Sequence, residues 1–323
     1  MKTILLTGVA GFIGHKTGEF LLRDGYRVLG VDNLNDYYTV NLKENRLSKL
    51  KEKSNFEFFE VDIEDFEKLS TIFDQFKIDA IMNLAARAGV PYSLENPHIY
   101  VSTNLQGSLN LLELAKNYKI EKYVLASTSS IYAGEKMPFS ENRPVNSPIS
   151  PYAASKKGAE LMAHAFHYIY GMDVSVVRYF TVYGPAGRPD MSIFRFIKWT
   201  DEGKPIMLYG DGTQSRDFTY VDDIAEGTIK ALKKVGYEIF NLGGGKNPID
   251  LITVIELIER KINKKAIIEN MEFQKTDINE TWADISKAKK LLDWSPKVDF
   301  TKGLDLTIEW YMENRSWLKD IEI

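Results

Sequence analysis

Short apolar runs alternate with longer amphipathic stretches through the first three quarters of the chain. The runs are rich in Val, Ile, Leu and Phe, a pattern typical of strands buried on both faces of a parallel sheet. The stretches between them repeat apolar residues at helical spacing. We expect strands at residues 3–7, 27–31, 56–61, 80–84, 123–127, 174–178 and 238–242. We expect a first helix that ends near residue 24, and further helices at 40–52, 65–76, 97–118, 152–170, 191–203 and 222–234.

Strand–helix alternation of this kind predicts an α/β fold, a doubly wound parallel sheet with right-handed crossovers. The rhythm changes after Tyr183, where Gly and Pro cluster at 184–189. The tail carries two amphipathic helices from about residue 249 and a terminal one near 302–315. We therefore predict one domain from 1–180 plus about 221–245, and a smaller α/β domain from 181–220 and 246–323.

The composition excludes several classes of function. The chain has no cysteine, so disulfides, thiolate nucleophiles and Cys-ligated metals are excluded, and four histidines leave little for a metal site. Its 41 Lys and Arg against 45 Asp and Glu (net charge −4) lack the basic excess of a nucleic-acid binder. No apolar run approaches the roughly 18 residues of a membrane span, and the N-terminal run is too short for a signal peptide. We expect a cytoplasmic protein without a metal.

A glycine loop follows the first strand and opens a helix. Gly8, Gly11 and Gly14 are spaced three apart, a variant of the dinucleotide-binding fingerprint of Rossmann-type domains. Gly8 allows a tight turn, Gly11 lets a pyrophosphate approach the helix N-terminus, and Gly14 allows close helix–sheet packing. Asp32 ends the second strand, where it can accept from a ribose 2′-hydroxyl. No Lys or Arg occurs from 33 to 42, so the pattern favours NAD over NADP.

Tyr152 and Lys156 form a Tyr-x-x-x-Lys pair at a predicted helix start, and their spacing puts both side chains on one helix face. A phenol with its ordinary pKa near ~10 needs a shift of roughly 3 units, about 4 kcal/mol, to act as a base at neutral pH. A neighbouring ammonium and a cationic nicotinamide can supply that shift. The pair follows the hydroxyl-rich strand end at 127–130, and ligands bind at the carboxyl edges of such sheets.

Seven motifs along the chain now identify a resemblance. The chain resembles the nucleotide-sugar epimerases and dehydratases, an extended short-chain dehydrogenase/reductase family, in TGVAGFIG (7–14), NLAARAG (83–89), STSSIY (127–132), YAASK (152–156), RYFTVYGP (178–185), YGDGTQSRDFTYVDD (209–223) and TWADISKAKKLL (281–292). This resemblance implies a catalytic triad of Thr128, Tyr152 and Lys156. It implies NAD contacts at Gly8, Gly11, Phe12, Ile13, Gly14, Asp32, Asn33, Asp62, Ile63, Leu84, Ala85, Ala86, Asn104, Tyr152, Lys156, Tyr179 and Val182.

The residues after Thr128 bear on the reaction. Related 4,6-dehydratases carry Asp-Glu there and UDP-glucuronate decarboxylases carry a glutamate, whereas this chain has Ser129 and Ser130. Hydroxyls cannot do carboxylate acid–base work at neutral pH. The pattern favours 4-epimerisation through a transient 4-keto sugar. The remaining alternatives are a decarboxylase or a dehydratase, and a catalytically silent nucleotide-sensing protein on the same fold.

The 178–191 segment resembles the UDP-glucuronate 4-epimerases, while a UDP-glucose/UDP-galactose or N-acetylhexosamine 4-epimerase stays open. We expect Ser129, Ser130 and Thr181 to donate to the sugar carboxylate. The other expected UDP-sugar contacts are Arg188 and Arg216 on the diphosphate, Gln214 beside them, Tyr209 near the uridine and Arg87 at the sugar.

The chain departs from known relatives at several positions. Arg87 and Pro91 stand where the subgroup commonly has glutamine and arginine, and Gln274 stands where many relatives carry a further arginine. The resemblance also implies a homodimer through the helices at 97–118 and 152–170.

Overall fold

The predicted strands pair as one parallel sheet in the computed structural model, which describes residues 1–246, 248–272 and 278–321. Their bounds are β1 (Thr3–Thr7), β2 (Arg27–Asp32), β3 (Phe56–Glu60), β4 (Ala80–Asn83), β5 (Lys122–Thr128), β6 (Asp173–Tyr179) and β11 (Tyr237–Leu242). Within the described residues this sheet has seven strands in the order β11-β6-β5-β4-β1-β2-β3. The chain changes direction across the sheet between β1 and β4, so their carboxyl ends border the crevice where ligands of such folds bind.

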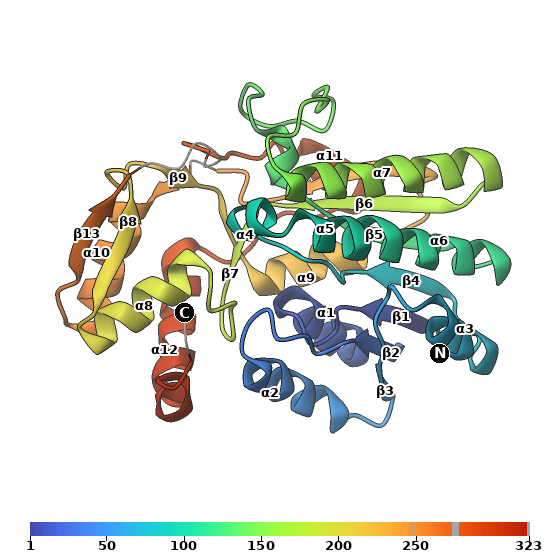
Figure 1. Cartoon of the computed structure of the whole chain (residues 1–323), viewed down its shortest axis with the longest axis horizontal. Coiled ribbons are helices and arrows are strands. Elements are labelled where there is room, and N and C mark those ends of the chain that lie inside the picture. The colour runs from blue at the N-terminus through green and yellow to red at the C-terminus, as the bar shows by residue number, and fades with distance from the viewer. Residues whose placement is uncertain (247, 273–277, 322–323) are drawn as a thin grey trace.

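Helices cover both faces of the sheet (Figure 1). The flanking helices are α1 (Phe12–Arg23), α2 (Val40–Lys51), α3 (Phe66–Gln75), α6 (Ser108–Asn117), α7 (Pro151–Tyr170), α9 (Val221–Lys230) and α11 (Ser286–Leu292). Neighbouring strand residues point to opposite faces. Leu6 packs with α1, α2, α9 and α11, whereas Leu5 packs with α3, α6 and α7. The apolar runs therefore build two separate cores, which confirms the predicted α/β fold.

The segment predicted as one helix over 97–118 is broken into three conformations. After the short helix α4 (Val90–Glu95), α5 (Pro97–Tyr100) leads into a π-helical turn, Val101–Gly107, before α6 begins. The hydroxyl of Ser108 donates to the carbonyl of Asn104 at 2.6 Å and so competes with the backbone donors of a regular helix. The predicted helical segment is thus confirmed in extent, from Pro97 to Asn117, but helical periodicity does not register the widening at Val101–Gly107.

The rest of the chain packs beside the carboxyl ends of the sheet strands, on the left of Figure 1. It contains β7 (Thr181–Tyr183), α8 (Ser192–Glu202), β8 (Pro205–Tyr209), β9 (Ser215–Arg216), β10 (Phe218–Tyr220), β12 (Ile249–Asp250), α10 (Leu251–Ile262), β13 (Ile267–Met271) and α12 (Phe300–Leu318). These strands pair as β7–β10, β8–β13 and β9–β12. A third buried apolar cluster joins α8, α10 and α12. Its position leaves the carboxyl edge of the sheet facing this second part.

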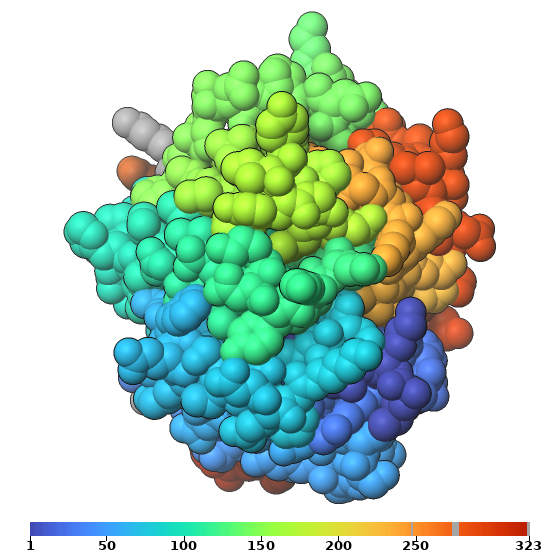
Figure 2. Space-filling view, turned by 90° about the vertical axis from the view of Figure 1, so that its right-hand side faces the viewer, coloured from blue at the N-terminus to red at the C-terminus, as the bar shows by residue number. Residues whose placement is uncertain are grey.

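The opposite side of the molecule presents the amino edge of the sheet. Figure 2 shows this face, with the N-terminus in dark blue and the C-terminal end of α7 in yellow-green. Tyr168, Ile169 and Tyr170 at that helix end are exposed. In the part of the chain that the structure describes, no helix is long and apolar enough to cross a membrane.

Candidate functional site

The glycine loop between β1 and α1 is shaped by contacts that leave no room for side chains. Gly8 has a φ of +69°, and a Cβ there would lie 2.7 Å from the Ala85 nitrogen. A Cβ on Gly14 would lie 1.9 Å from the Gly8 carbonyl oxygen. Gly11 caps α1 without a side-chain hydrogen bond, so the first N–H groups of the helix stay available to an anion.

Asp32 stands beside this loop at the end of β2. Its two carboxylate oxygens accept from the Ala10 and Leu34 N–H groups, each at 3.0 Å. Burial raises the pKa of the Asp32 carboxyl above its usual range. Asn33 donates to the Asp62 carboxylate at 2.6 Å, which brings together two more of the predicted cofactor residues. Asp32 thus contacts the glycine loop directly, and Asp62 is linked to it through Asn33.

Three further predicted cofactor segments surround the loop. Leu84, Ala85 and Ala86 follow β4 directly, and the Ala85 N–H donates to the Thr7 hydroxyl at 3.2 Å. Ile63 is buried against Gly107 of the π-helical turn. Phe12 at the start of α1 lines a hollow that also includes Thr181, Val182 and Arg188. Ile13 packs against the core beneath the loop.

Lys43 is a residue near this site that the sequence analysis missed. It sits on α2, and its ammonium donates to the Asn35 side-chain oxygen at 3.1 Å and to the Asn35 backbone carbonyl. Burial lowers the pKa of Lys43 to about 8, although the Asp32 charge opposes that shift. The stretch 33–42 without Lys or Arg therefore does not keep cations away from Asp32. Only the return of α2 over the loop reveals this.

The predicted triad meets where β5 and α7 adjoin. Thr128 ends β5 opposite Tyr179 of β6, and its hydroxyl donates to the Ser130 hydroxyl at 3.1 Å. Ser129 and Ser130 form a 3₁₀ turn, Ser129–Tyr132, directly after it. Tyr152 lies in the first turn of α7, close enough to Thr128 for that side chain to lower the pKa of the phenol. Tyr179 itself turns its hydroxyl to Thr228 at 2.9 Å, so only its backbone faces this edge.

Burial dominates the electrostatics of the pair on α7. It raises the pKa of the Tyr152 phenol, while the hydrogen bond from Thr128 and the Arg188 charge act in the opposite direction. Burial also lowers the pKa of the Lys156 ammonium to about 8. Burial of this site therefore disfavours both the phenolate form of Tyr152 and the ammonium form of Lys156.

Asn104 connects the π-helical turn to α7, the helix that carries Tyr152. Its amide donates to the Ser155 hydroxyl at 2.9 Å and to the Arg87 carbonyl at 3.0 Å, and its oxygen accepts from the Arg87 N–H at 2.8 Å. Ser155 in turn donates to the Tyr152 carbonyl at 2.8 Å. The Asn104 side chain is thus fully engaged by protein groups, and it fixes the loop after β4 relative to Tyr152.

Two arginines converge on the ring of Tyr37. The guanidinium carbons of Arg87 and Arg188 lie 6.0 and 5.6 Å from its centroid. Arg87 also donates to the Asn35 side chain at 3.0 Å, and Arg188 forms a 2.5 Å ion pair with Asp190. Arg188 therefore lies with Arg87, and both are held near the loop that follows β2.

The remaining predicted substrate residues lie on β8 and β9. Tyr209 ends β8 and is partly exposed, and its carbonyl accepts from the Gln214 amide. The side-chain oxygen of Gln214 is buried and has no hydrogen-bond partner among the described residues. Arg216 donates to the carbonyls of Ser215 and Asn279. Gln274 lies outside the described residues.

Arg46 is a second residue that sequence reasoning missed. It is 1% exposed, and its guanidinium donates to the carbonyls of Ala10, Ala186 and Gly187 and to the Tyr38 hydroxyl, at 2.6–3.2 Å. It thereby holds the glycine loop against the 184–189 segment that carries Arg188. Its one sequence signal is its position three residues after Lys43, on the same face of α2.

The site contains carboxylates, hydroxyls and cations but no metal cluster. Among the described residues, no group of three or more His, Asp and Glu side chains is arranged to hold a metal ion.

Comparisons with known proteins are consistent over nearly the whole chain. Residues 5–307 match the family model described as GDP-mannose 4,6 dehydratase. The chain is 61% identical over 323 residues to a UDP-glucuronate 4-epimerase of Thermodesulfobacterium geofontis, with 100% of both chains covered. It is 40% identical to UDP-glucuronate 4-epimerase 4 of Arabidopsis thaliana, covering 96% of this chain and 75% of that protein.

Two solved structures are similar in fold. One is the Bacillus cereus UDP-glucuronic acid 4-epimerase in complex with UDP-glucuronic acid and NAD, with a TM-score of 0.90, 36% identity, and 97% and 99% of the two chains covered. The other is the Thermotoga maritima UDP-glucose 4-epimerase with UDP-glucose, with a TM-score of 0.88, 31% identity and the same coverage. The backbone alone thus hardly separates the two substrates, and local side chains have to do so.

Proposed function

Because this chain belongs to the extended short-chain dehydrogenase/reductase family, we propose that it is an NAD-dependent UDP-glucuronate 4-epimerase. It interconverts UDP-glucuronate and UDP-galacturonate through a transient 4-keto sugar. The observation that carries the sugar assignment is the hydroxyl-lined turn Thr128-Ser129-Ser130, placed at the strand end beside Tyr152.

The residues around the glycine loop fit NAD. The space that a Cβ on Gly8 or Gly14 would fill is closed by backbone, so the loop approaches its ligand with N–H groups only. Asp32 keeps lone pairs for ribose hydroxyls beyond the two N–H groups it already accepts from. NAD, when bound, would supply the hydride chemistry at the sugar C4, with hydride removed from one face and returned to the other.

Tyr152, Thr128 and Lys156 handle the proton. Tyr152 takes the 4-hydroxyl proton as a phenolate and gives it back when the sugar is reduced. Thr128 donates a hydrogen bond to that oxygen in place of its present hydrogen bond to Ser130. Lys156 is fully buried four residues after Tyr152, so its ammonium favours the phenolate and holds ribose hydroxyls.

Ser129, Ser130 and Thr181 hold the sugar carboxylate with neutral donors. None of the three can transfer a proton as a carboxylate does, so water elimination from C5 and C6 has no base. A carboxylate held in the ring plane resists loss of CO₂ from the keto sugar, because that loss needs the breaking bond aligned with the carbonyl π system. Epimerisation is then the outcome that remains.

Cations serve the charged parts of the substrate. Arg87 and Arg188, packed on Tyr37, border the sugar and the diphosphate. Arg216, with Gln214 beside it, binds the diphosphate from β9, and Tyr209 lies near the uridine. This division assigns NAD to 1–180 plus about 221–245, and the UDP-sugar to 181–220 and 246–323. The third apolar cluster supports it, since it forms mainly from the second set of residues. One stretch of that set departs from the division, because Ala283, Ala288 and Trp294, around α11, pack in the core of the seven-stranded sheet.

We also propose a cytoplasmic homodimer. Leu161 and Ile169 on α7 are 59% and 64% exposed, and Leu94 and Val101 beside α5 are more than half exposed. Large apolar side chains grouped on adjacent helices are typical of an interface. Sedimentation should show a dimer that Leu161→Glu dissociates, and a monomer at micromolar concentration would contradict the assignment.

Product analysis tests the function. The protein is incubated separately with UDP-glucuronate and UDP-glucose, and the nucleotide sugars are separated by chromatography. UDP-galacturonate should form from the first substrate without release of CO₂. Tyr152→Phe should lower kcat by about 100-fold or more, since proton transfer contributes that much. Turnover of UDP-glucose alone would overturn the sugar assignment and indicate a UDP-glucose 4-epimerase.

A further inference from the structure

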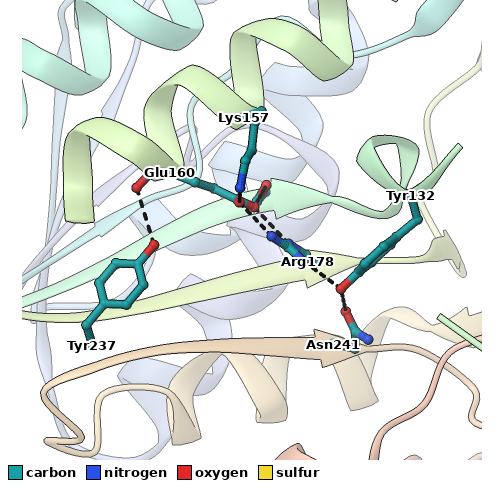
Figure 3. Close-up of polar contacts among 7 residues, drawn as sticks. Tyr132, Lys157, Glu160, Arg178, Tyr237 and Asn241 are labelled. Carbon is teal, nitrogen blue, oxygen red and sulfur yellow. Dashed lines mark hydrogen bonds and ion pairs between the residues drawn. The ribbon is translucent and has the colours of Figure 1, made fainter. Parts of the chain in front are cut away.

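A buried ion pair lies directly behind the catalytic pair. Glu160 is on α7, one turn after Lys156, and its carboxylate binds the guanidinium of Arg178 on β6 in two places, at 2.7 and 2.9 Å (Figure 3). Both side chains are 1% exposed. Neither side chain hydrogen-bonds the glycine loop, and no step of the proposed reaction uses this ion pair.

Hydrogen bonds extend from this pair to the two neighbours of the Thr128–Ser130 hydroxyls, Ser127 and Tyr132. Ser127, the residue before Thr128, donates to Glu160 at 2.6 Å. Arg178 donates at 2.6 Å to the hydroxyl of Tyr132, which ends the 3₁₀ turn of Ser129 and Ser130 (Figure 3).

The network is also anchored on the far side of the sheet. The Tyr132 hydroxyl donates to the Asn241 side chain on β11 at 2.8 Å. The Asn241 amide in turn donates to the Phe139 carbonyl at 2.8 Å. One carboxylate thus joins α7, β5 and β6, and through Tyr132 it reaches the 3₁₀ turn and β11.

Stability alone does not account for such an arrangement. A buried ion pair stabilises a fold little more than apolar side chains of similar volume, because both charges lose their water. A satisfied polar network, by contrast, permits one geometry only. A network that joins Ser127, Tyr132 and α7 therefore fixes where the Thr128 and Ser130 hydroxyls stand relative to Tyr152.

We propose that Glu160 is a positioning residue of the reaction, which holds the Thr128–Ser130 hydroxyls in register with Tyr152 and Lys156. The proposal rests on the epimerase function given above. It assigns no proton transfer to Glu160, which acts through Ser127, Arg178 and the helix that it shares with the catalytic pair.

The charge of Glu160 has a second effect on the same helix. It raises the pKa of Lys156 against the larger lowering by burial. The charged groups that face Glu160 are Arg178 from β6 and Lys157 from α7, whose ammonium lies 3.4 Å away. The titratable phenols nearby are Tyr132, through Arg178, and Tyr237 of β11, which donates to the Glu160 backbone carbonyl at 3.3 Å.

Two substitutions separate geometry from charge. Glu160→Gln removes the charge and leaves Arg178 without a carboxylate partner, and we expect kcat to fall by about 10- to 100-fold with KM changed less than about threefold. In Glu160→Gln the basic limb of the kcat–pH profile should move to lower pH, because without the Glu160 charge the Lys156 ammonium loses its proton more easily. Glu160→Asp keeps the charge but shortens the side chain, so kcat should fall while the limb stays where it is in the parent.

Folding is controlled by a double variant, E160Q/R178M, which removes both charges together and leaves no unpaired guanidinium. Lys157→Met and Tyr237→Phe are the matched controls, because each loses a contact to Glu160 without touching the hydrogen bonds to Ser127 and Arg178. Each variant is measured with its melting temperature and bound NAD.

The outcomes are distinct. A folded, NAD-loaded E160Q or E160Q/R178M with kcat within twofold of the parent overturns the proposal, as does an equal loss in Lys157→Met. If E160Q does not fold, the double variant decides alone. The parent protein is compared on whichever UDP-sugar it converts. In addition, the tyrosinate absorbance that Tyr152→Phe lacks is titrated in the NAD-bound protein. Failure of the sugar assignment therefore leaves this test intact.

Discussion

Gly14→Ala should weaken the binding of NAD. A Cβ on Gly14 would lie 1.9 Å from the Gly8 carbonyl oxygen, whereas real Cβ contacts are essentially never under 3.0 Å. The difference, 3.0 − 1.9 = 1.1 Å, is the least distance by which α1 and the glycine loop have to separate. Both colliding groups are held by backbone, so neither can rotate away as a side chain would.

The magnitude follows from that displacement. Overpacking of this kind costs about 2 kcal/mol, within the usual range of 1–3. If the cost falls on the loop conformation that binds NAD, the dissociation constant rises about 30-fold. The first N–H groups of α1 also move away from the pyrophosphate, which adds to the loss.

The control lies one turn along the same helix. A Cβ on Gly18 would meet only the methyl groups of Leu6 and Leu50, at 3.4 Å, and these side chains can adjust. Alanine is also a better helix former than glycine by about 1 kcal/mol. Gly18→Ala should therefore keep its NAD and melt no lower than the parent.

The assay is the NAD content of each purified protein, measured after denaturation by chromatography, together with its melting temperature. A Gly14→Ala protein with the NAD content and melting temperature of the parent would refute the steric argument. Equal loss in Gly14→Ala and Gly18→Ala would show that the helix, and not the loop contact, is sensitive.

Three further predictions follow from described contacts. Because burial lowers the pKa of Lys156 to about 8, kcat should fall as the pH rises through that value. Lys156→Arg should move this fall in kcat to higher pH. A kcat that still rises from pH ~8 to ~10 would count against this role of the Lys156 ammonium. Arg46→Met leaves three buried carbonyls without their donor and should lower the free energy of unfolding, measured with denaturant, by about 3 kcal/mol. Arg27→Met loses only an exposed ion pair and should lower it by less than about 1 kcal/mol. Similar losses in the two variants would contradict this reasoning. Ser150→Ala removes the N-cap of α7, which accepts from the Ala153 N–H at 3.2 Å, and should cost about 1 kcal/mol in the same measurement; no change in midpoint would argue against the cap.

The sheet could be predicted from sequence because its strands are continuous apolar runs. The predicted strands agree with the structure within one residue at each end, from Thr3–Thr7 to Tyr237–Leu242. The order of the strands in the sheet could not be predicted in this way, because parallel neighbours are far apart in sequence and no local pattern identifies which strands pair. The π-helical turn Val101–Gly107 was missed because a side chain, Ser108, alters a backbone carbonyl without changing the apolar spacing.

In the candidate site, too, contacts between residues close in sequence could be predicted, whereas contacts between distant residues could not. Tyr152 and Lys156, or Gly8 and Gly14, are close in sequence, so their spacing alone indicates a shared face or turn. The contact of Arg46 with Ala186 spans 140 residues, and only folding reveals it. The neighbourhood of Asp32 was misjudged for the same reason, because the cation that reaches it comes from the following helix.

The position of β11 at the edge of the sheet limits when the sheet can be completed during synthesis of the chain. It pairs with β6 from Val174 to Tyr179, yet the whole excursion between the two strands must first leave the ribosome. Until then β6, whose Val174, Val176 and Val177 are fully buried in the finished protein, is an open edge available to other nascent chains. A fragment cut at residue 180 keeps that edge permanently, so the cofactor-binding part should not be obtained in soluble form without the residues that follow it.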